Sequence, residues 1–95
     1  MTLKRVVITG LGAVTPIGNT IPEFWDSVVN GKSGAAPITG FNTETILTKT
    51  KFACEVKNFD LSLYMDRKEA RKVDKYTHFA IGAAVQAIED ASIDK

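Results

Sequence analysis

Two side chains that could act as a nucleophile, a general base or a metal ligand occur once each in this sequence, Cys54 and His78. A single cysteine excludes a disulfide framework and a multi-cysteine zinc or iron–sulfur site, and it fits a reducing compartment. A single histidine excludes a metal motif built on two histidines. Reactive cysteines need an electropositive, partly exposed setting, whereas Cys54 lies on the apolar side of an alternating segment. We therefore expect an inert, buried thiol, and a solvated or surface-bonded ring at His78.

Two glycine-containing segments resemble parts of phosphate-binding loops. Gly10 and Gly12 follow a short apolar run, as in the turn that brings backbone N–H groups to a pyrophosphate, but Thr15 stands at the third glycine position. Gly31 precedes a lysine and a serine, as at the end of a P-loop, but Asp26 replaces the glycine required five positions earlier. Neither motif is complete. A small nucleotide- or polyanion-binding module is kept as an alternative interpretation.

Charge is concentrated in one stretch of a nearly neutral chain. The formal net charge is +1, so bulk charge gives no reason to expect nucleic acid or an anionic membrane as a partner. Residues 67–75 nevertheless carry five basic and two acidic side chains. These five basic residues, here called the basic segment, are Arg67, Lys68, Arg71, Lys72 and Lys75.

On a single helix, four residues of the basic segment would fall at i, i+3, i+4 and i+7 and form one exposed ridge, with Arg67 at its edge. Cations in the first turns of a helix oppose its macrodipole, at a cost of up to about 1 kcal/mol each before screening. Such a ridge is best explained by an anionic partner that docks on it. We therefore expect an acidic macromolecule to bind there, in a salt-sensitive association.

The elements that would position these residues follow from the apolar pattern. The β-branched run at 6–8 predicts a strand buried on both faces, which needs neighbours on either side. Thr20 and Glu23 have the spacing of a capping box and predict a helix over 21–30, with Gly31 as its left-handed C-cap. The segment 32–48 is predicted to be a surface loop with at most a short ordered piece.

The second half of the chain predicts one strand and one long helix. Residues 51–57 alternate, with Phe52, Cys54 and Val56 on the inward face of a half-buried strand. Asp66, with Glu69 three residues later, predicts the start of a single helix that continues to residue 91. The core face of this helix is rich in small residues, which indicates close approach by another backbone. That face comprises Val73, Tyr76, Thr77, Ala80, Ala83, Ala84, Ala87, Ile88 and Ala91, with Gly82 nearby.

These elements do not form a closed domain by themselves. The predicted strand needs two neighbours, and the predicted helix is Ala-rich. We therefore expect the 95 residues to be part of a larger α/β body. Polar residues interrupt the apolar start and no small-x-small cleavage site follows, so a secretion signal is not expected. No apolar run has the length of a membrane span. We expect a soluble, cytoplasmic protein.

Several motifs together resemble the beginning of the bacterial β-ketoacyl-acyl-carrier-protein synthase II family. The resemblance runs along the whole chain, in order. It is carried by Arg5-Val6-Val7-Ile8-Thr9-Gly10-Leu11-Gly12, Thr15-Pro16-Ile17-Gly18-Asn19, Phe24-Trp25, Gly31-Lys32-Ser33-Gly34 and Arg67-Lys68-Glu69-Ala70-Arg71-Lys72.

The resemblance implies a thiolase-like α/β fold, with a mixed central sheet, helices on both faces and assembly as a homodimer. It implies decarboxylative Claisen condensation of malonyl-acyl-carrier protein with an enzyme-bound acyl thioester, in fatty-acid elongation. Residues 1–95 would be the first portion of such an enzyme. The family's nucleophilic cysteine and catalytic histidines are expected beyond Lys95. No catalytic residue, cofactor or metal is therefore expected here, and the 95 residues alone are not expected to be active.

One functional role does carry over from the family. Lys68, Arg71 and Lys72 match positions that dock the acidic acyl carrier protein, and Arg67 is expected to assist. The charge pattern and the resemblance thus point to the same residues. A ketosynthase of a polyketide system is the related alternative.

Overall fold

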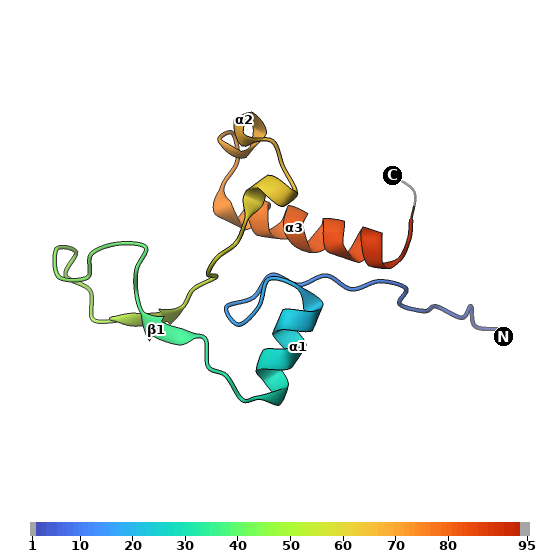
Figure 1. Ribbon diagram of the computed structural model, residues 1–95, viewed down its shortest axis with the longest axis horizontal. Coiled ribbons are helices and arrows are strands. Elements are labelled where there is room, and N and C mark those ends of the chain that lie inside the picture. The colour runs from blue at the N-terminus through green and yellow to red at the C-terminus, as the bar shows by residue number, and fades with distance from the viewer. Residues whose placement is uncertain (1, 94–95) are drawn as a thin grey trace. The chain divides into compact units, whose positions relative to one another are not determined.

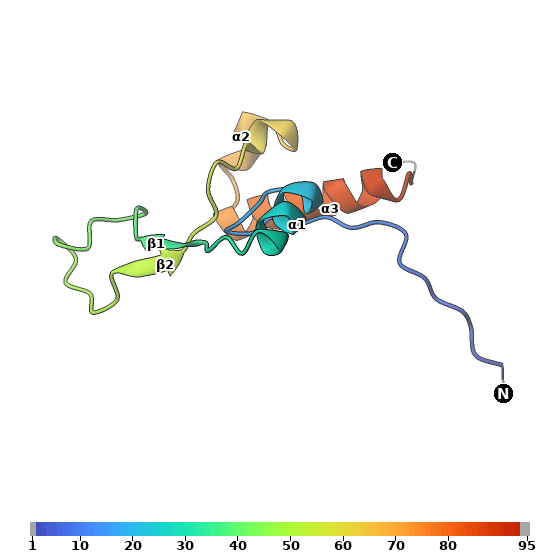
Figure 2. The ribbon, with the colours of Figure 1, turned by 60° about the horizontal axis from the view of Figure 1, so that its bottom comes forward.

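The computed structural model describes residues 2–93. Lys95, beyond which the family's catalytic residues are expected, lies outside the described residues. Contacts along the chain divide it into two compact units, of which the first combines the residues up to Gly12 with those from Leu61 onward, and the second is Ala13–Asp60. The described residues form six elements. In chain order they are α1 (Ile21–Val29), β1 (Ala35–Pro37), β2 (Phe52–Cys54), the 3-10 helix η1 (Leu61–Leu63), α2 (Arg67–Ala70) and α3 (Lys75–Asp90). Figure 1 labels α1, β1, α2 and α3, and Figure 2 also labels β2.

Helix α1 begins where the sequence predicted and ends one residue earlier. The Thr20 hydroxyl accepts a hydrogen bond from the Glu23 N–H at 3.3 Å, which is the expected N-cap. The Glu23 carboxylate accepts from the N–H of Asn19 at 3.1 Å, whereas the capping box predicted Thr20 as that donor. Gly31 follows the helix with φ of 65°, a left-handed conformation that glycine adopts without steric cost. The predicted start, the Thr20 cap and the left-handed Gly31 are confirmed, whereas the helix ends one residue earlier than predicted and the return bond differs.

Strands β1 and β2 form an antiparallel pair in the same unit (Figure 2). Ala36 lies opposite Ala53, and the Ile38 N–H extends the pairing with a 3.0 Å bond to the Lys51 carbonyl oxygen. Strand β1 is the short ordered piece within the predicted loop 32–48, and β2 is shorter than the predicted strand 51–57.

The expected burial of β2 is wrong. The Phe52 side chain is 65% exposed and Cys54 is exposed as well. Alternation correctly placed both residues on one face, but alternation does not supply the layer that would cover that face. Within the described residues, this face of the two-stranded sheet remains open to solvent.

The predicted single helix over 66–91 is also wrong, because the chain forms α2, a turn and then α3. Asp74 is extended, with φ of −81° and ψ of 165°, and occupies the N-cap position of α3. Its carbonyl oxygen accepts from the N–H groups of Thr77 and His78 at 3.0 and 3.2 Å. Val73 and Asp74 are poor helix formers, and aspartate favours N-cap positions, so the interruption has a local cause. Asp66 provides no side-chain cap to α2, so the second predicted capping box does not form.

The end of the N-terminal segment, at Gly10 and Gly12, packs against α3 in the same unit. The Leu11 N–H donates to the Asp90 carboxylate at 3.0 Å. A Cβ atom at Gly12 would collide with the Ala83 carbonyl oxygen, and one at Gly10 with that of Ala87. The predicted close approach of a backbone to this helix is therefore confirmed. It gives both glycines a packing role.

The same segment does not form the predicted strand at 6–8. Val6 and Ile8 are 88% and 82% exposed. A strand exists only as part of a hydrogen-bonded ladder, and no described residue pairs with this one. The pattern of apolar residues can mark a buried strand, but the neighbouring strands must come from other parts of a fold.

The predicted core face of the long helix is only partly covered. The N-terminal segment packs against Ala83, Ala87 and Ala91, and Gly82 is buried. Tyr76, by contrast, is 74% exposed, and Ala80 and Ala84 are exposed too. Helical periodicity identified one wide face, and the described part of the chain covers one side of it.

Candidate functional site

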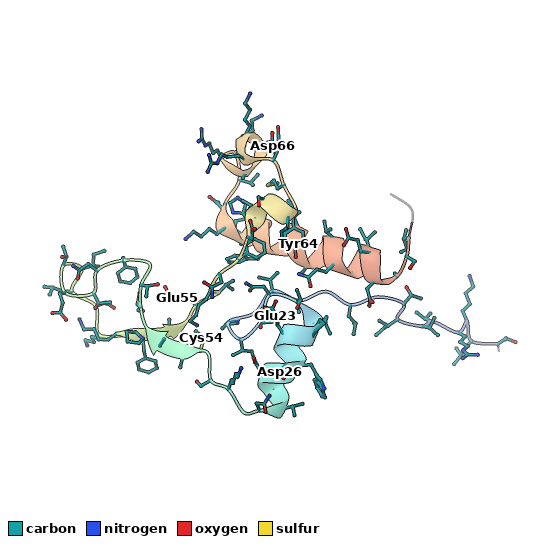
Figure 3. The ribbon with its side chains drawn as sticks, viewed as in Figure 1. Glu23, Asp26, Cys54, Glu55, Tyr64 and Asp66 are labelled. Atoms are coloured by element: carbon teal, nitrogen blue, oxygen red, sulfur yellow. The ribbon has the colours of Figure 1, made fainter. Side chains whose placement is uncertain are left out.

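The basic segment lies on α2, on the turn that follows it and on the first residue of α3. Arg67 and Lys68 belong to α2, Arg71 is its C-cap residue, Lys72 lies in the turn and Lys75 begins α3. All five residues are exposed. Because the predicted helix is interrupted, they do not form one helical ridge. Instead, they form a basic cluster in the sequence that spans α2, the turn and the first residue of α3, and Figure 3 labels Asp66, the residue before α2.

The positive charge of this cluster is largely unpaired. Lys72 is 3.4 Å from the Glu69 carboxylate, and the two side chains are 69% and 61% exposed. Such exposed pairs contribute little to stability, about 0–1 kcal/mol. Within residues 2–93, none of Arg67, Lys68, Arg71 and Lys75 forms an ion pair. Their charges are therefore free to act on a partner from solution.

The start of α3 combines an acidic N-cap residue, Asp74, with a basic first residue. Lys75 is the first residue of α3, and no acidic residue follows in the first turn of that helix. A cation at this position opposes the helix macrodipole. The sequence predicted basic residues in the first turns of one long helix, where they oppose the macrodipole. In the structure Lys75 occupies such a position at the start of α3.

The turn between α2 and α3 is fixed by one buried residue and one ring. Ala70 is 8% exposed and is the buried apolar residue of this unit. The Nε2 atom of His78 lies 2.8 Å from the Ala70 carbonyl oxygen, in a partly buried position. The expectation of a surface-bonded histidine is confirmed, and its partner is a backbone carbonyl of α2.

The structure describes the other two candidate groups, Cys54 and His78, in separate units. The expectation of a buried thiol at Cys54 is wrong, because the residue is exposed on β2. Cys54 belongs to the unit Ala13–Asp60 and His78 to the other unit. Within the described residues, no group of three or more histidine, cysteine, aspartate or glutamate side chains could hold a metal ion.

Glu55 forms a cluster that the sequence analysis missed. Its carboxylate accepts hydrogen bonds from the Thr39 N–H, the Thr39 hydroxyl and the Gly40 N–H, each at 3.0 Å. These bonds, led by the one from the Thr39 backbone, hold the pKa of the carboxyl below its ordinary value of 4.5, with a smaller contribution from Lys57. The alternating strand pattern was the only sequence signal for this cluster. It does not identify the hydrogen-bond donors, because Thr39 and Gly40 lie 16 and 15 residues away in the sequence. These hydrogen bonds hold the start of the loop between β1 and β2 in place.

No helix in the described part of the chain combines the length and apolar character required to cross a bilayer.

Comparison with known proteins places this arrangement in a family. The family model described as "Beta-ketoacyl synthase, N-terminal domain" matches residues 3–95. A Synechocystis protein named 3-oxoacyl-[acyl-carrier-protein] synthase 2 is 48% identical over 90 residues, which cover 95% of this chain and 21% of the relative. Proteins of the same name from Coxiella burnetii and Vibrio cholerae are 44% and 40% identical, each over 99% of this chain and 22% of the relative.

A solved structure shows the same likeness in three dimensions. It is titled "The ishigamide ketosynthase/chain length factor", superposes with a TM-score of 0.81 and is 32% identical. The superposition covers 93% of this chain and 21% of that one. The chain thus spans about a fifth of the length of the relatives it matches. These matches imply a thiolase-like fold, although the layered sheet is not visible in the two short strands of the described residues. The chain belongs to the beta-ketoacyl synthase family, because its residues 3–95 match the model of that family's N-terminal domain.

Proposed function

We propose that this chain is the first portion of a condensing enzyme that elongates fatty acyl chains. The reaction would be decarboxylative Claisen condensation of malonyl-acyl-carrier protein with an enzyme-bound acyl thioester. Support comes from relatives up to 48% identical that are named 3-oxoacyl-[acyl-carrier-protein] synthase 2. In this reaction a cysteine thiolate takes up the acyl group, and hydrogen-bond donors stabilise the negative charge on the reacting oxygens. Cys54 and His78 are assigned neither role, because we expect the residues that perform them to follow Lys95.

We further propose that the basic segment docks the acidic acyl carrier protein. The observation that carries this proposal is the exposed basic cluster, in which Arg67, Lys68, Arg71 and Lys75 have no ion pair within the described residues. Charges of this kind attract an oppositely charged protein over roughly 10 Å at moderate salt and increase its association rate. They also align the partner, because complementary charge patterns disfavour other orientations.

The docking proposal is tested by reversing two charges in the full-length protein. We expect Lys68→Glu with Arg71→Glu to raise the KM for malonyl-acyl-carrier protein about tenfold at low salt, because two attractions become repulsions. The dependence of KM on salt should also weaken. The measurement is steady-state condensation at several ionic strengths.

The matched control is Lys4→Glu with Lys49→Glu. It changes the net charge by the same amount at two exposed positions outside the basic segment. The control should leave KM near the wild-type value. An unchanged low-salt KM in the Lys68 and Arg71 variant would contradict docking at this site.

A polyketide ketosynthase is the second candidate, because the structural neighbour is a ketosynthase/chain length factor. Product analysis separates the two. Condensation on saturated acyl chains supports fatty-acid elongation, whereas successive condensations without reduction support polyketide synthesis. The resemblance also implies a cytoplasmic homodimer, and analytical ultracentrifugation of the full-length protein tests the oligomeric state.

A further inference from the structure

The basic segment depends on a helix that is too short to hold its own orientation. Helix α2 has four residues, and isolated helices below about 12–15 residues are marginal in water. Its backbone bonds in this turn include those from the Ala70 N–H to Asp66 and from the Arg71 N–H to Arg67, at 2.9 and 3.3 Å. Neither Asp66 nor Asp74 supplies a side-chain cap. The orientation of α2 must therefore be set by contacts with the rest of its unit.

His78 supplies such a contact. It is the fourth residue of α3, and its Nε2 atom lies 2.8 Å from the Ala70 carbonyl oxygen, eight residues earlier in the chain. A carbonyl oxygen can only accept, so Nε2 carries the hydrogen and donates it. Among the described residues, no other side-chain hydrogen bond connects α2 with α3.

The acceptor is one of the carbonyl groups that a helix leaves free at its C-terminus. The last carbonyl oxygens of a helix have no partner within it and need one from elsewhere. The Ala70 carbonyl oxygen otherwise accepts only from the Val73 N–H, at a long 3.5 Å. Ala70 is also 8% exposed, so the ring fastens α2 at its buried end. Arg67, Lys68 and Arg71 surround this attachment point in the sequence and face solvent.

We propose that His78 is a positioning residue for carrier-protein docking. By donating to the Ala70 carbonyl oxygen, it fixes α2 on α3 and thereby sets where Lys68 and Arg71 present their charges. The inference deepens the proposed function and rests on it. His78 acts through the basic segment and does not touch the carrier protein or the reacting atoms.

The test compares His78→Met with His78→Gln in the full-length protein. Both side chains are unbranched and similar in length, but only glutamine keeps an N–H donor that can reach the carbonyl. The measured quantity is the KM for malonyl-acyl-carrier protein divided by the KM for the same malonyl thioester on free pantetheine. We expect His78→Met to raise this ratio about fivefold, the effect of losing one hydrogen bond. His78→Gln should keep it within about twofold of the wild-type value.

The outcomes separate a positioning role from a general structural one. If His78→Met raises both KM values together, the ratio stays constant and the inference is overturned. If His78→Gln raises the ratio as much as His78→Met does, the donor is not the cause and the inference is likewise overturned. A double variant, His78→Met with Arg71→Gln, should raise the ratio by less than the product of the single effects, because both changes act on one cluster.

Two further readouts keep the test decisive. If His78→Met does not fold, amide hydrogen exchange over residues 71–74 in the folded His78→Gln protein is compared with that of the wild type. Equal protection supports the proposal, and faster exchange overturns it. The charge-reversed variant with Lys68→Glu and Arg71→Glu distinguishes a failure of the docking proposal from a failure of the proposed role of His78. If the charge-reversed variant leaves the KM ratio unchanged, the proposed docking function is wrong. If the charge-reversed variant raises the KM ratio and His78→Met does not, only the proposed role of His78 is wrong.

Discussion

Glu55 shows how much one side chain can organise when three donors converge on it. Its carboxylate accepts from two groups of Thr39 and from the Gly40 N–H, and it holds the loop that joins β1 to β2. The Lys57 ammonium donates to the carbonyl oxygens of Gly34 and Glu55, at the end of the strand pair where Ala35 lies opposite Cys54. The loop therefore has a defined start although it contains little regular structure.

The first prediction concerns the ionisation of Glu55. Its pKa is lowered in the folded chain, chiefly by the hydrogen bond from the Thr39 backbone. The stabilising contribution is therefore fully present above the ordinary value of 4.5 and is lost as the pH falls through the lower folded value. Amide exchange over residues 38–42, expressed relative to an unstructured peptide, should accelerate in that acidic range.

A substitution should reproduce the acidic behaviour at neutral pH. Glu55→Gln leaves one acceptor oxygen for three donors, so exchange over 38–42 should be several-fold faster at pH 7. Glu44→Gln, in the same loop, is the matched control and should have no effect. Equal exchange in the wild type and in Glu55→Gln would show that the carboxylate does not hold this loop.

At the scale of elements, α3 is the scaffold on which its unit is built. The N-terminal segment approaches its backbone at Gly10 and Gly12, and Gln86 donates to the Tyr64 hydroxyl at 3.1 Å, next to η1. The glycines that resemble a phosphate-binding turn are thus explained by packing. The absence of a side chain is what permits this contact.

The second prediction tests that contact. Gly12→Ala should lower the free energy of unfolding of the full-length protein by about 1–3 kcal/mol, because the added methyl group must displace the Ala83 carbonyl or the segment itself. Thermal unfolding followed by circular dichroism measures the change. Gly31→Asn is the control, since its Cβ would meet open space and asparagine tolerates positive φ. Equal melting temperatures for Gly12→Ala and the wild type would contradict the packing role.

At the scale of the whole molecule, the described chain exposes much apolar surface. Val6, Ile8 and Leu47 are 88%, 82% and 93% exposed, and Ala70 is the buried apolar residue of the described part. Burial of apolar surface must offset the conformational entropy lost on folding. So little burial cannot do so for 95 residues.

The third prediction follows from that balance. The isolated chain should show no cooperative thermal transition by circular dichroism, and sedimentation should reveal aggregation. A longer protein of the proposed kind should unfold cooperatively, because additional residues would cover the exposed strand and helix faces. A sharp melt of a monomeric 95-residue chain would contradict this expectation and would favour a self-sufficient module.

The sequence by itself determined what depends on residues a few positions apart. The Thr20 cap, the left-handed Gly31 and the close backbone approach at Ala83 and Ala87 were predicted correctly, because their hydrogen bonds and contacts are encoded locally or by helical period. The motif resemblance also identified the family correctly. The identities and exposure of the basic segment followed from the charge pattern alone.

Only the tertiary structure decided where long-range partners meet. The attachment of α2 through His78 and the hydrogen bonds to the Glu55 carboxylate depend on groups that no sequence period brings together. The strand predicted at 6–8 and the burial predicted for Cys54 failed for the complementary reason. A pattern shows which face of a segment is apolar, whereas burial and pairing require a second segment to cover it.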